Sequence, residues 1–448
     1  MSFFKRNFLN IFSYLFSPLI IILVKNSAKL FFSDSWIYAI SFLQAILVAR
    51  FLGVEKYGLL ALITAYVTLV NQVVDFRVKE TVVKYTSEFM VKKDKERILA
   101  TIKLCYLIDL STGILAFLIV VFTAKFVSIR IMHHSAISNL IILYSIILLV
   151  QTVDGTCYGV ISAFEKFTWL SLYSAMAETI RFVAIAIALL TKGGIKSLLI
   201  NYLIAAFINS SVLLFSSLKI IKKSIPHLPL NSKISLLYPR RKEIIKFLFN
   251  TNLNELFTLF TKNIDIMILG YFRNAQEVGF YRLAKNFVNT FGLISNPFYT
   301  AIYPYLAKLW MSDILGFKRF IKQVTIFMTS LTMPLALITF ITIDWIIKHS
   351  AGLAFLPSAN LVRIMLLGII IATILVWTRP AFLSLGRLGT LTLVNFFSAA
   401  TMFVLSLVIV PSIGSRGSAL LFVYPYLIGH LIAIFAFKKI LKEYEAPS

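Results

Sequence analysis

Long apolar runs separated by short polar segments dominate the pattern of residues along the chain. Twelve runs have roughly the length, about 20 residues, that a helix needs to cross the hydrocarbon core of a bilayer. These runs are residues 35–51, 59–74, 104–122, 136–153, 167–190, 197–218, 247–270, 279–304, 323–347, 361–385, 390–410 and 418–437. Short alternating apolar and polar segments, the pattern of a transmembrane barrel, are absent. The pattern therefore predicts an all-α polytopic membrane protein with about 12 transmembrane helices.

The composition agrees with this class. The 448 residues are 59% hydrophobic and 14% charged, with a mean hydropathy of +0.87, which is more apolar surface than one soluble core could bury. A further apolar stretch, residues 8–24, has basic residues on both sides. This favours a helix lying in the membrane interface over a thirteenth span, and no small-residue cleavage site follows it. Cys105 and Cys157 both fall inside predicted spans, so we predict neither a disulfide framework nor a metal site.

The formal net charge is +25, and the basic residues crowd alternate loops. Residues 77–97, 219–246, 308–322 and 438–442 carry most of them, whereas the opposite loops carry few. By the positive-inside rule the basic side is cytoplasmic, which predicts that both termini face the cytoplasm. Because topology accounts for the charge, we do not predict nucleic acid as a partner.

The two halves of the chain align at a constant offset of 221 residues, which indicates an internal duplication. The aligned pairs are Gly58 and Gly279, Lys166 and Arg387, Gly193 and Gly414, and Ser197 and Ser418. Six spans per half would give two pseudo-symmetric lobes with a substrate route between them, as in many transporters. The predicted segments are an N-terminal interfacial segment (1–27), an N-terminal six-helix lobe (28–218), a basic cytoplasmic linker (219–246), a C-terminal six-helix lobe (247–437) and a cytoplasmic tail (438–448).

Polar residues at helical spacing mark three of the predicted spans. One face of the second span carries Thr64, Thr68, Asn71 and Asp75, and the positions at the same offset are Lys285, Asn289, Gly292 and Asn296. The seventh span carries Thr251, Glu255, Thr258, Lys262 and Asp265 on one face. A charge at the bilayer centre costs at least about 2.5 kcal/mol, so these faces are expected to look into the bundle or a wet cavity.

Several stretches together resemble one family. AILVARFLGVEKYGLLAL, NIDIMILGYFRNAQEVGFYRLA, NPFYTAIYPYLAKL and LSLGRLGTLTLVNF, followed by IVPSIGSRGSALLF, resemble the Wzx-type polysaccharide flippases of the multidrug/oligosaccharidyl-lipid/polysaccharide (MOP) exporter superfamily. The resemblance covers nearly the whole chain, from about Ala28 to Lys439. One departure is DFRVKE at residues 75–80, where Arg77 stands in the place of a common glycine and puts a tight turn there in doubt.

The resemblance implies a MATE-like fold and a flippase in the bacterial inner membrane. Such proteins pass undecaprenyl-diphosphate-linked oligosaccharide repeat units, of O antigen or a related surface polysaccharide, across the membrane by alternating access. Membrane lipids, a polysaccharide polymerase and a chain-length regulator are the further partners that it implies. Two alternatives remain open: a MATE-like drug/cation antiporter, and a flippase of another lipid-linked precursor such as that of peptidoglycan.

The chemistry of a lipid-linked diphosphate selects the candidate binding residues. Cations in a low-dielectric cavity attract a diphosphate, and amides can hydrogen-bond sugars. The substrate-binding candidates are Arg50, Lys262, Arg282, Lys285, Asn254 and Asn289. Arg50 lies near a span end, where its side chain could instead reach the interface.

Three intramembrane carboxylates, Glu255, Asp265 and Glu178, are candidates for proton or sodium coupling. The competing interpretation is a structural ion pair, since Lys262 lies three residues before Asp265 and Arg181 three residues after Glu178. We predict no resident cofactor or metal. No catalytic residues are predicted either, because the chain lacks a P-loop and an extramembrane Ser/His/Asp or paired-carboxylate arrangement.

Overall fold

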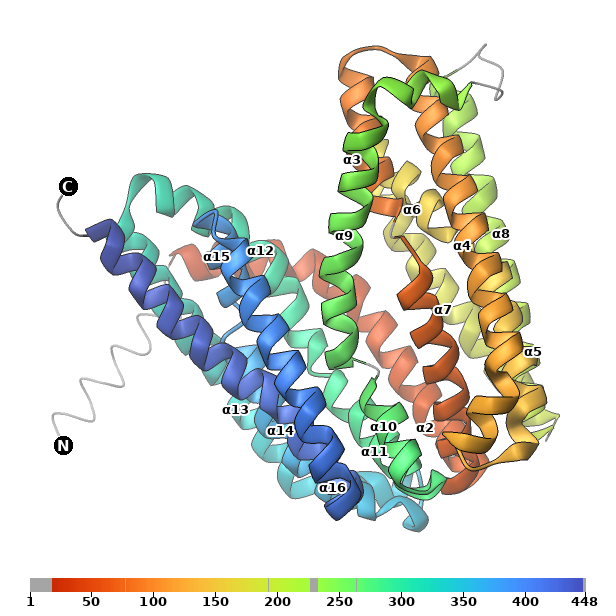
Figure 1. Cartoon of the computed structure of the whole chain (residues 1–448). Coiled ribbons are helices and arrows are strands. Elements are labelled where there is room, and N and C mark those ends of the chain that lie inside the picture. The colour runs from red at the N-terminus through yellow and green to blue at the C-terminus, as the bar shows by residue number, and fades with distance from the viewer. Residues whose placement is uncertain (1–17, 77, 192, 226–232, 263, 446–448) are drawn as a thin grey trace, which may run out of the picture. The chain divides into compact units, whose positions relative to one another are not determined.

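The computed structural model describes residues 18–76, 78–191, 193–225, 233–262 and 264–445, and every regular element in them is helical (Figure 1). The α-helices are α2 (Pro18–Val74), α3 (Val78–Val91), α4 (Lys95–Arg130), α5 (Ser138–Val150), α6 (Asp154–Ala163), α7 (Phe167–Leu190), α8 (Gly194–Ser224), α9 (Arg241–Lys262), α10 (Ile264–Phe272), α11 (Ala275–Asn289), α12 (Gly292–Ser312), α13 (Ile314–Ser350), α14 (Pro357–Ile374), α15 (Thr378–Ser384) and α16 (Leu388–Glu445). Three short 3-10 helices are η1 (Ser135–Ile137), η2 (Ile234–Arg240) and η3 (Leu353–Phe355).

The predicted fold class is confirmed, although some helices contain more than one span. Eight helical stretches of the described residues are long and apolar enough to cross a membrane. Two of them, Ser35–Val91 and Gly389–Leu441, each contain two predicted spans. The remaining two predicted spans correspond to α9 with α10 and to α11 with α12, which carry more polar residues.

Two glycines divide the longest helices. Gly53 in α2 has φ 71° and ψ 172°, and Gly414 in α16 has φ 58° and ψ −135°. A positive φ is accessible to glycine at little cost but is strained for residues with a Cβ atom. Each long helix is therefore two spans joined by a sharp glycine turn.

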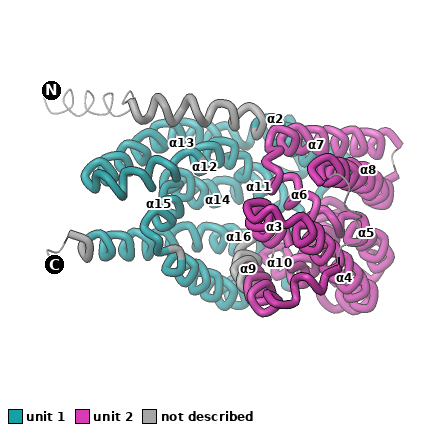
Figure 2. Tube along the Cα trace, turned by 90° about the horizontal axis from the view of Figure 1, so that it is seen from above, with its two compact units in different colours: residues 1–54, 272–448 teal, residues 55–271 magenta. Residues whose placement is uncertain are grey.

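The helices form two compact units (Figure 2). Unit 1 consists of Met1–Val54 and Phe272–Ser448, and unit 2 is Glu55–Tyr271. These units differ from the predicted segments, because the first predicted span clusters with unit 1 and the seventh with unit 2. In unit 1, Phe42 of α2 packs edge to face on Phe287 of α11 at 4.8 Å. The two units are defined by contacts in space, whereas the two predicted repeats are defined by their order along the chain. The division into two repeats therefore stays a prediction.

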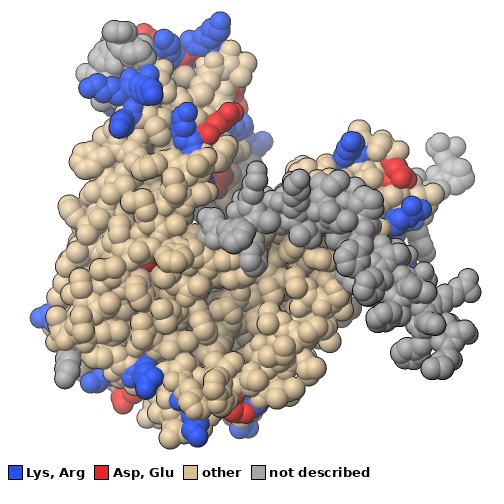
Figure 3. Space-filling model, turned by 180° about the vertical axis from the view of Figure 1, so that it is seen from behind, with Lys and Arg blue, Asp and Glu red and all other residues tan. Residues whose placement is uncertain are grey.

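Helix α4 shows why these bundles suit a membrane. Its buried face carries small and polar residues such as Cys105, Asp109 and Ala116, whereas Leu110, Leu118 and Phe122 are exposed. Small residues let helices approach closely, and large apolar residues suit contact with lipid tails. On the face shown in Figure 3, Lys and Arg gather toward the ends of the unit 2 helices, with a broad, nearly uncharged surface between.

Candidate functional site

A small polar cavity lies inside unit 2, where the helical stretch Ser135–Ala163 breaks into two helices. The break falls between the end of α5 at Val150 and the start of α6 at Asp154. The cavity has a volume of about 60 Å³. Its lining residues are Asn71, Asp75, Asp109, Thr112, Gly113, Ile147, Leu148, Gln151, Thr152 and Gly155.

Asp109 of α4 organises this cavity by capping a neighbouring helix. Its Oδ2 accepts hydrogen bonds from the Thr156 backbone N–H at 2.9 Å and from the Thr156 hydroxyl at 2.7 Å. The Thr152 hydroxyl donates to the Asp109 carbonyl at 2.6 Å. The Thr156 N–H is one of the first-turn donors that α6 cannot satisfy itself, so a carboxylate at this position stabilises the helix start. Asp109 thus has a structural role in the observed conformation.

A larger pocket lies inside unit 1, at a second helix break. Helix α14 ends at Ile374 and α15 begins at Thr378. Pro380 has no N–H to donate to the Val376 carbonyl, and its ring would clash with that carbonyl in a continuous helix. The sequence therefore ends α14 before this proline and starts a new helix that contains it in its first turn.

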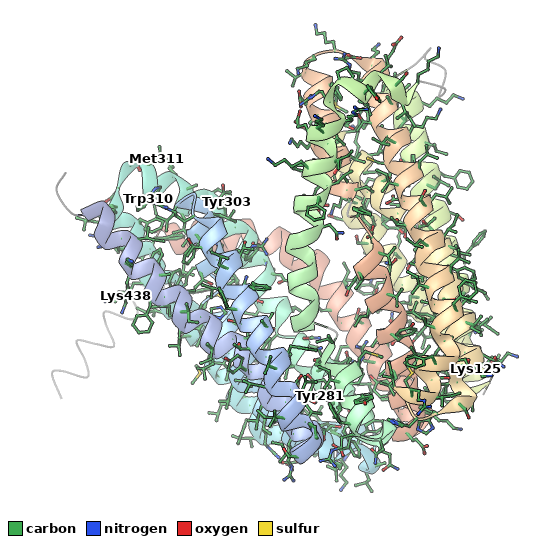
Figure 4. All side chains as sticks on the ribbon, in the orientation of Figure 1. Lys125, Tyr281, Tyr303, Trp310, Met311 and Lys438 are labelled. Carbon is green, nitrogen blue, oxygen red and sulfur yellow. The ribbon has the colours of Figure 1, made fainter. Side chains whose placement is uncertain are left out.

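Aromatic packing fixes the position of α15. The rings of Trp377 and Phe382 lie 5.3 Å and 6.2 Å from the Phe437 ring of α16. Phe437 also contacts Phe317, whose ring lies 5.4 Å from that of Trp310. Figure 4 shows Trp310 near the end of α12 and Lys438, which follows Phe437, on α16. These rings anchor the helix that carries Arg379.

The unit 1 pocket has a volume of about 200 Å³ and combines one fixed positive charge with neutral polar groups. The residues lining it are Ser295, Asn296, Tyr299, Ala372, Leu375, Val376, Thr378, Arg379 and His430. The Arg379 guanidinium lies 5.9 Å from the centre of the Tyr299 ring. Asn296 Nδ2 donates a hydrogen bond to the Tyr38 hydroxyl at 2.5 Å. Because none of the described residues that line it is acidic, the pocket suits a negatively charged group.

The two cavities occupy related positions in the duplicated sequence. At the 221-residue offset, Asp75 corresponds to Asn296, Gln151 to Ala372 and Gly155 to Val376, and each of these six residues lines its cavity. The helix breaks themselves are offset by 224 residues, from Val150 to Ile374. The cavities differ in charge, since carboxylates line the one in unit 2 and an arginine lines the one in unit 1. This correspondence supports the predicted duplication.

The predicted cations of α11 lie in unit 1. Lys285 is buried, with its Nζ 5.9 Å from the centre of the Tyr281 ring, which Figure 4 places on the same helix. Arg282 is half-buried, and Asn289 is exposed at the last position of α11. None of the three lines the pocket of Arg379.

Arg50 of α2 lies at the end of another helix. Its Nη1 donates to the carbonyls of His349 at 3.3 Å and Ser350 at 3.5 Å, the last two residues of α13. A cation beside unsatisfied carbonyls at a helix C-terminus is stabilising. In this conformation Arg50 caps α13, and its predicted role in substrate binding stays a prediction.

Two of the predicted coupling carboxylates are buried in unit 2. Glu178 is paired with Arg181 of the same helix, whose Nη2 lies 2.5 Å and 2.7 Å from the two carboxylate oxygens. Asp265 lies in the first turn of α10, and its Oδ1 accepts a hydrogen bond from the Ile266 N–H at 2.8 Å. Both carboxylates therefore have structural partners here.

The remaining predicted residues are Asn254, Glu255 and Lys262. They belong to α9, but their side chains lie outside the described part of the structure. The possible pairing of Lys262 with Asp265 stays a prediction for the same reason. Among the residues that are described, no group of three or more His, Cys, Asp or Glu side chains is arranged to hold a metal ion.

Sequence reasoning missed Arg379, His430 and Asp109. Arg379 and Asp109 are intramembrane charges, which by themselves mark functional or structural positions. Pro380, the residue after Arg379, was a second signal, because a proline within an apolar run indicates a helix break. Polar groups gather at this break. His430 lies among apolar residues of the last span, and no local signal connected it with residues 295–299.

A model of the family "Polysaccharide biosynthesis protein" matches residues 23–310. A search of curated proteins gives no match. Among solved structures, the fold is similar to that of the Lipid II flippase MurJ in an inward closed conformation, with a TM-score of 0.73, 17% identity, and coverage of 92% of this chain and 87% of that one.

Two further solved structures have the same fold. An inward-facing multidrug resistance MATE family transporter of the MOP superfamily gives a TM-score of 0.73 at 12% identity, covering 92% of this chain and 96% of that one. A MOP superfamily transporter from Pyrococcus furiosus, described as having a binding pocket of reverse polarity, gives 0.65 at 12% identity, with coverage of 96% and 97%. At these identities the likeness establishes the MOP fold alone.

Proposed function

The chain belongs to the family of polysaccharide biosynthesis proteins, and from this premise we propose that it is a flippase and not an enzyme. Its proposed substrate is an undecaprenyl-diphosphate-linked oligosaccharide repeat unit, of O antigen or a related surface polysaccharide. Translocation runs across the bacterial inner membrane by alternating access. The observation that carries the proposal is the polar pocket of unit 1, whose described lining contains Arg379 and no acidic residue.

The substrate presents a diphosphate, a row of hydroxyls and a polyprenyl tail. Arg379, Lys285 and Arg282 provide positive charge within unit 1, where Lys285 is buried, Arg282 is half-buried and Arg379 is exposed. Charge-assisted hydrogen bonds to phosphate are stronger than those between neutral groups. Arg50, Lys262, Asn254 and Asn289 remain proposed contacts. The tail, which is as apolar as the exposed faces of the helices, stays in the bilayer.

Coupling to a proton or sodium gradient is part of the same proposal. Glu255, Asp265 and Glu178 are the proposed coupling groups. For Glu178 to take up a proton, its ion pair with Arg181 must open, so coupling at this residue requires a conformation in which the two side chains separate.

The proposed orientation places both termini in the cytoplasm of a bacterial inner-membrane protein. The basic segments 77–97 and 219–246 would then lie on the cytoplasmic side. Phosphatase and fluorescent-protein fusions at the C-terminus check this directly. A polymerase and a chain-length regulator are the proposed protein partners, since they act on the translocated product.

The proposed activity is tested with proteoliposomes containing the purified chain and a lipid-linked oligosaccharide whose outward exposure is read by a lectin or a glycosidase. Transport of this substrate, but not of ethidium or of a peptidoglycan precursor, is the expected result. Export of a cationic dye would favour the drug/cation antiporter, and transport of the peptidoglycan precursor alone would favour that flippase. A null strain should lose surface polysaccharide and regain it with this gene.

A further inference from the structure

We propose that the unit 1 pocket is a subsite for an oxyanion of the lipid-linked oligosaccharide, with Arg379 as its charged contact. This inference rests on the proposed function and deepens it, because it names the part of the substrate that one site recognises. None of the predicted substrate-binding residues lines this pocket, but Asn296, which belongs to a predicted polar face, does.

Arg379 is held where it can meet an anion. Helix α15 is short, begins after a break and is anchored by the packing of Trp377 and Phe382 on Phe437. The guanidinium lies 5.9 Å from the centre of the Tyr299 ring, a separation at which the ring face attracts a cation. A planar guanidinium offers paired donors that match the oxygens of a phosphate or carboxylate. Because none of the described lining residues is acidic, no carboxylate of the described lining neutralises this charge.

The other polar groups of the lining suit hydroxyls. His430 Nδ1 lies 2.8 Å from the Tyr426 carbonyl, and because a carbonyl only accepts, Nδ1 must carry the proton. In the neutral ring Nε2 is then an acceptor. The hydroxyl groups of Ser295 and Tyr299 can both donate and accept. Mixed donors and acceptors beside one fixed cation fit a sugar that bears an acidic group.

The volume indicates how much of a ligand the pocket can surround. The cavity of about 200 Å³ corresponds to roughly six or seven waters at about 30 Å³ each. This is the scale of one sugar ring or one phosphate group with a few waters, and it is smaller than typical sites for drug-sized ligands, about 300 Å³ or more. The pocket therefore holds one group of the substrate, while the rest of the oligosaccharide lies outside it.

The counterpart in unit 2 shows what changed between the repeats. There the equivalent position to Asn296 is Asp75, and the buried carboxylate of Asp109 lies beside the same cavity. A carboxylate at position 296 would repel an anion and pair with Arg379 instead. In unit 1 that carboxylate is absent from the lining, which keeps the arginine available to a bound oxyanion.

The oxyanion could belong to the diphosphate of the lipid carrier or to an acidic sugar, and binding measurements separate these sources. The probes for the full chain in nanodiscs are inorganic pyrophosphate, methyl glucuronide and neutral methyl glucoside. We expect one of the two anions to bind more tightly than methyl glucoside. Binding of pyrophosphate identifies the diphosphate as the source, and binding of the glucuronide alone identifies an acidic sugar. Failure of both anions to bind overturns the proposal.

Variants locate the site. Arg379→Gln should weaken anion binding at least about tenfold, a loss of about 1.4 kcal/mol, while Arg379→Lys should retain part of the binding. The matched control is Arg387→Gln, which removes an exposed arginine just after α15 and outside the pocket. Unchanged anion binding in Arg379→Gln contradicts the proposal.

If Arg379→Gln does not fold, as judged by its thermal unfolding, the variant His430→Gln tests the site instead. If the glucuronide binds, His430→Gln should lower the preference for glucuronide over pyrophosphate. If only pyrophosphate binds, His430→Gln should weaken that binding.

The flipping assay separates this inference from the proposed function. Wild-type protein that binds an anion through Arg379 but moves no lipid-linked oligosaccharide would overturn the proposed function and leave the binding site intact. Wild-type protein that flips this substrate, with Arg379→Gln binding anions as tightly as wild type, would overturn the subsite alone.

Discussion

The carboxylate of Glu277 caps the helix segment that begins after Gly414. Glu277 Oε2 accepts a hydrogen bond from the Ser415 N–H at 2.6 Å, where the positive φ of Gly414 divides α16. Arg273, one turn earlier, donates from Nη2 to the carbonyls of Pro411 at 2.8 Å and Ser412 at 2.9 Å. Glu277 and Arg273 thus stabilise both sides of the break in α16. Arg273 donates to carbonyl groups at the end of the first helix segment, and Glu277 accepts from an N–H at the start of the second.

Replacing Glu277 by Ala should destabilise this turn. The Ser415 N–H would lose a charged acceptor at a helix start, which typically costs about 1 to 2 kcal/mol. Thermal unfolding of the protein in detergent measures the change. Glu55→Ala, which removes an exposed glutamate in α2, is the control and should leave the midpoint nearly unchanged. Equal midpoints for the two variants would show that the cap contributes little.

Gly279 permits a close approach of backbones inside unit 1. A Cβ atom added there would overlap the carbonyl oxygen of Val54, and a backbone atom cannot move aside as a flexible side chain can. Gly279→Ala should therefore lower stability by roughly 1 to 3 kcal/mol, as overpacking does. Gly389→Ala is the matched control, because nothing lies within 4 Å of its added Cβ. A Gly279→Ala protein as stable as this control would refute the packing argument.

Asp109 offers a test of the helix cap in unit 2. Asp109→Leu leaves the buried hydroxyl and N–H of Thr156 without their acceptor, and each such loss costs about 1 to 3 kcal/mol. Asp109→Asn retains one acceptor oxygen and should be less destabilising. The order of unfolding midpoints should be wild type, Asn, Leu. If the Leu variant is the most stable of the three, the carboxylate has been kept for something other than this cap.

The ion pair of Glu243 with Arg240 predicts a dependence on pH. The two guanidinium bonds at 2.9 Å, followed by the Tyr85 hydroxyl and the charge of Lys84, hold the pKa of Glu243 below its usual range. A lowered folded-state pKa gives stability that is present above the unfolded value, about 4.3, and is lost as the pH falls through the folded value. Arg240→Gln should therefore reduce the difference in unfolding midpoint between pH 7 and pH 3.

The control for this ion pair is Arg241→Gln. Arg241 is the next residue, and its guanidinium stacks on Tyr238 with 3.9 Å between the guanidinium carbon and the ring centre. Its removal should preserve the pH difference of the wild type. Since Arg240 also pairs with Glu88 at 2.6 Å, Glu243→Gln is needed to assign the effect. A pH difference that survives both Arg240→Gln and Glu243→Gln would rule out this pair as its source.

The sequence alone determined the membrane class and the family. Length and hydropathy of each run are local properties, so the runs around Leu110 and Phe215 could be identified without knowledge of their neighbours. The sequence also predicts an internal duplication, because positions such as Gly193 and Gly414 keep one offset. The same spacing identified Lys285 as an inward residue, and it is buried.

Only the tertiary structure decided which polar residues share a cavity. Arg379, His430 and Tyr299 are far apart in sequence and belong to three helices whose rotation about their axes no local pattern fixes. Spacing along one helix could suggest that Glu178 meets Arg181, but it could not show that Arg50 lies on the last carbonyls of α13. Pairings within a helix follow from its periodicity, whereas pockets form from the packing of different helices, which depends on the whole chain.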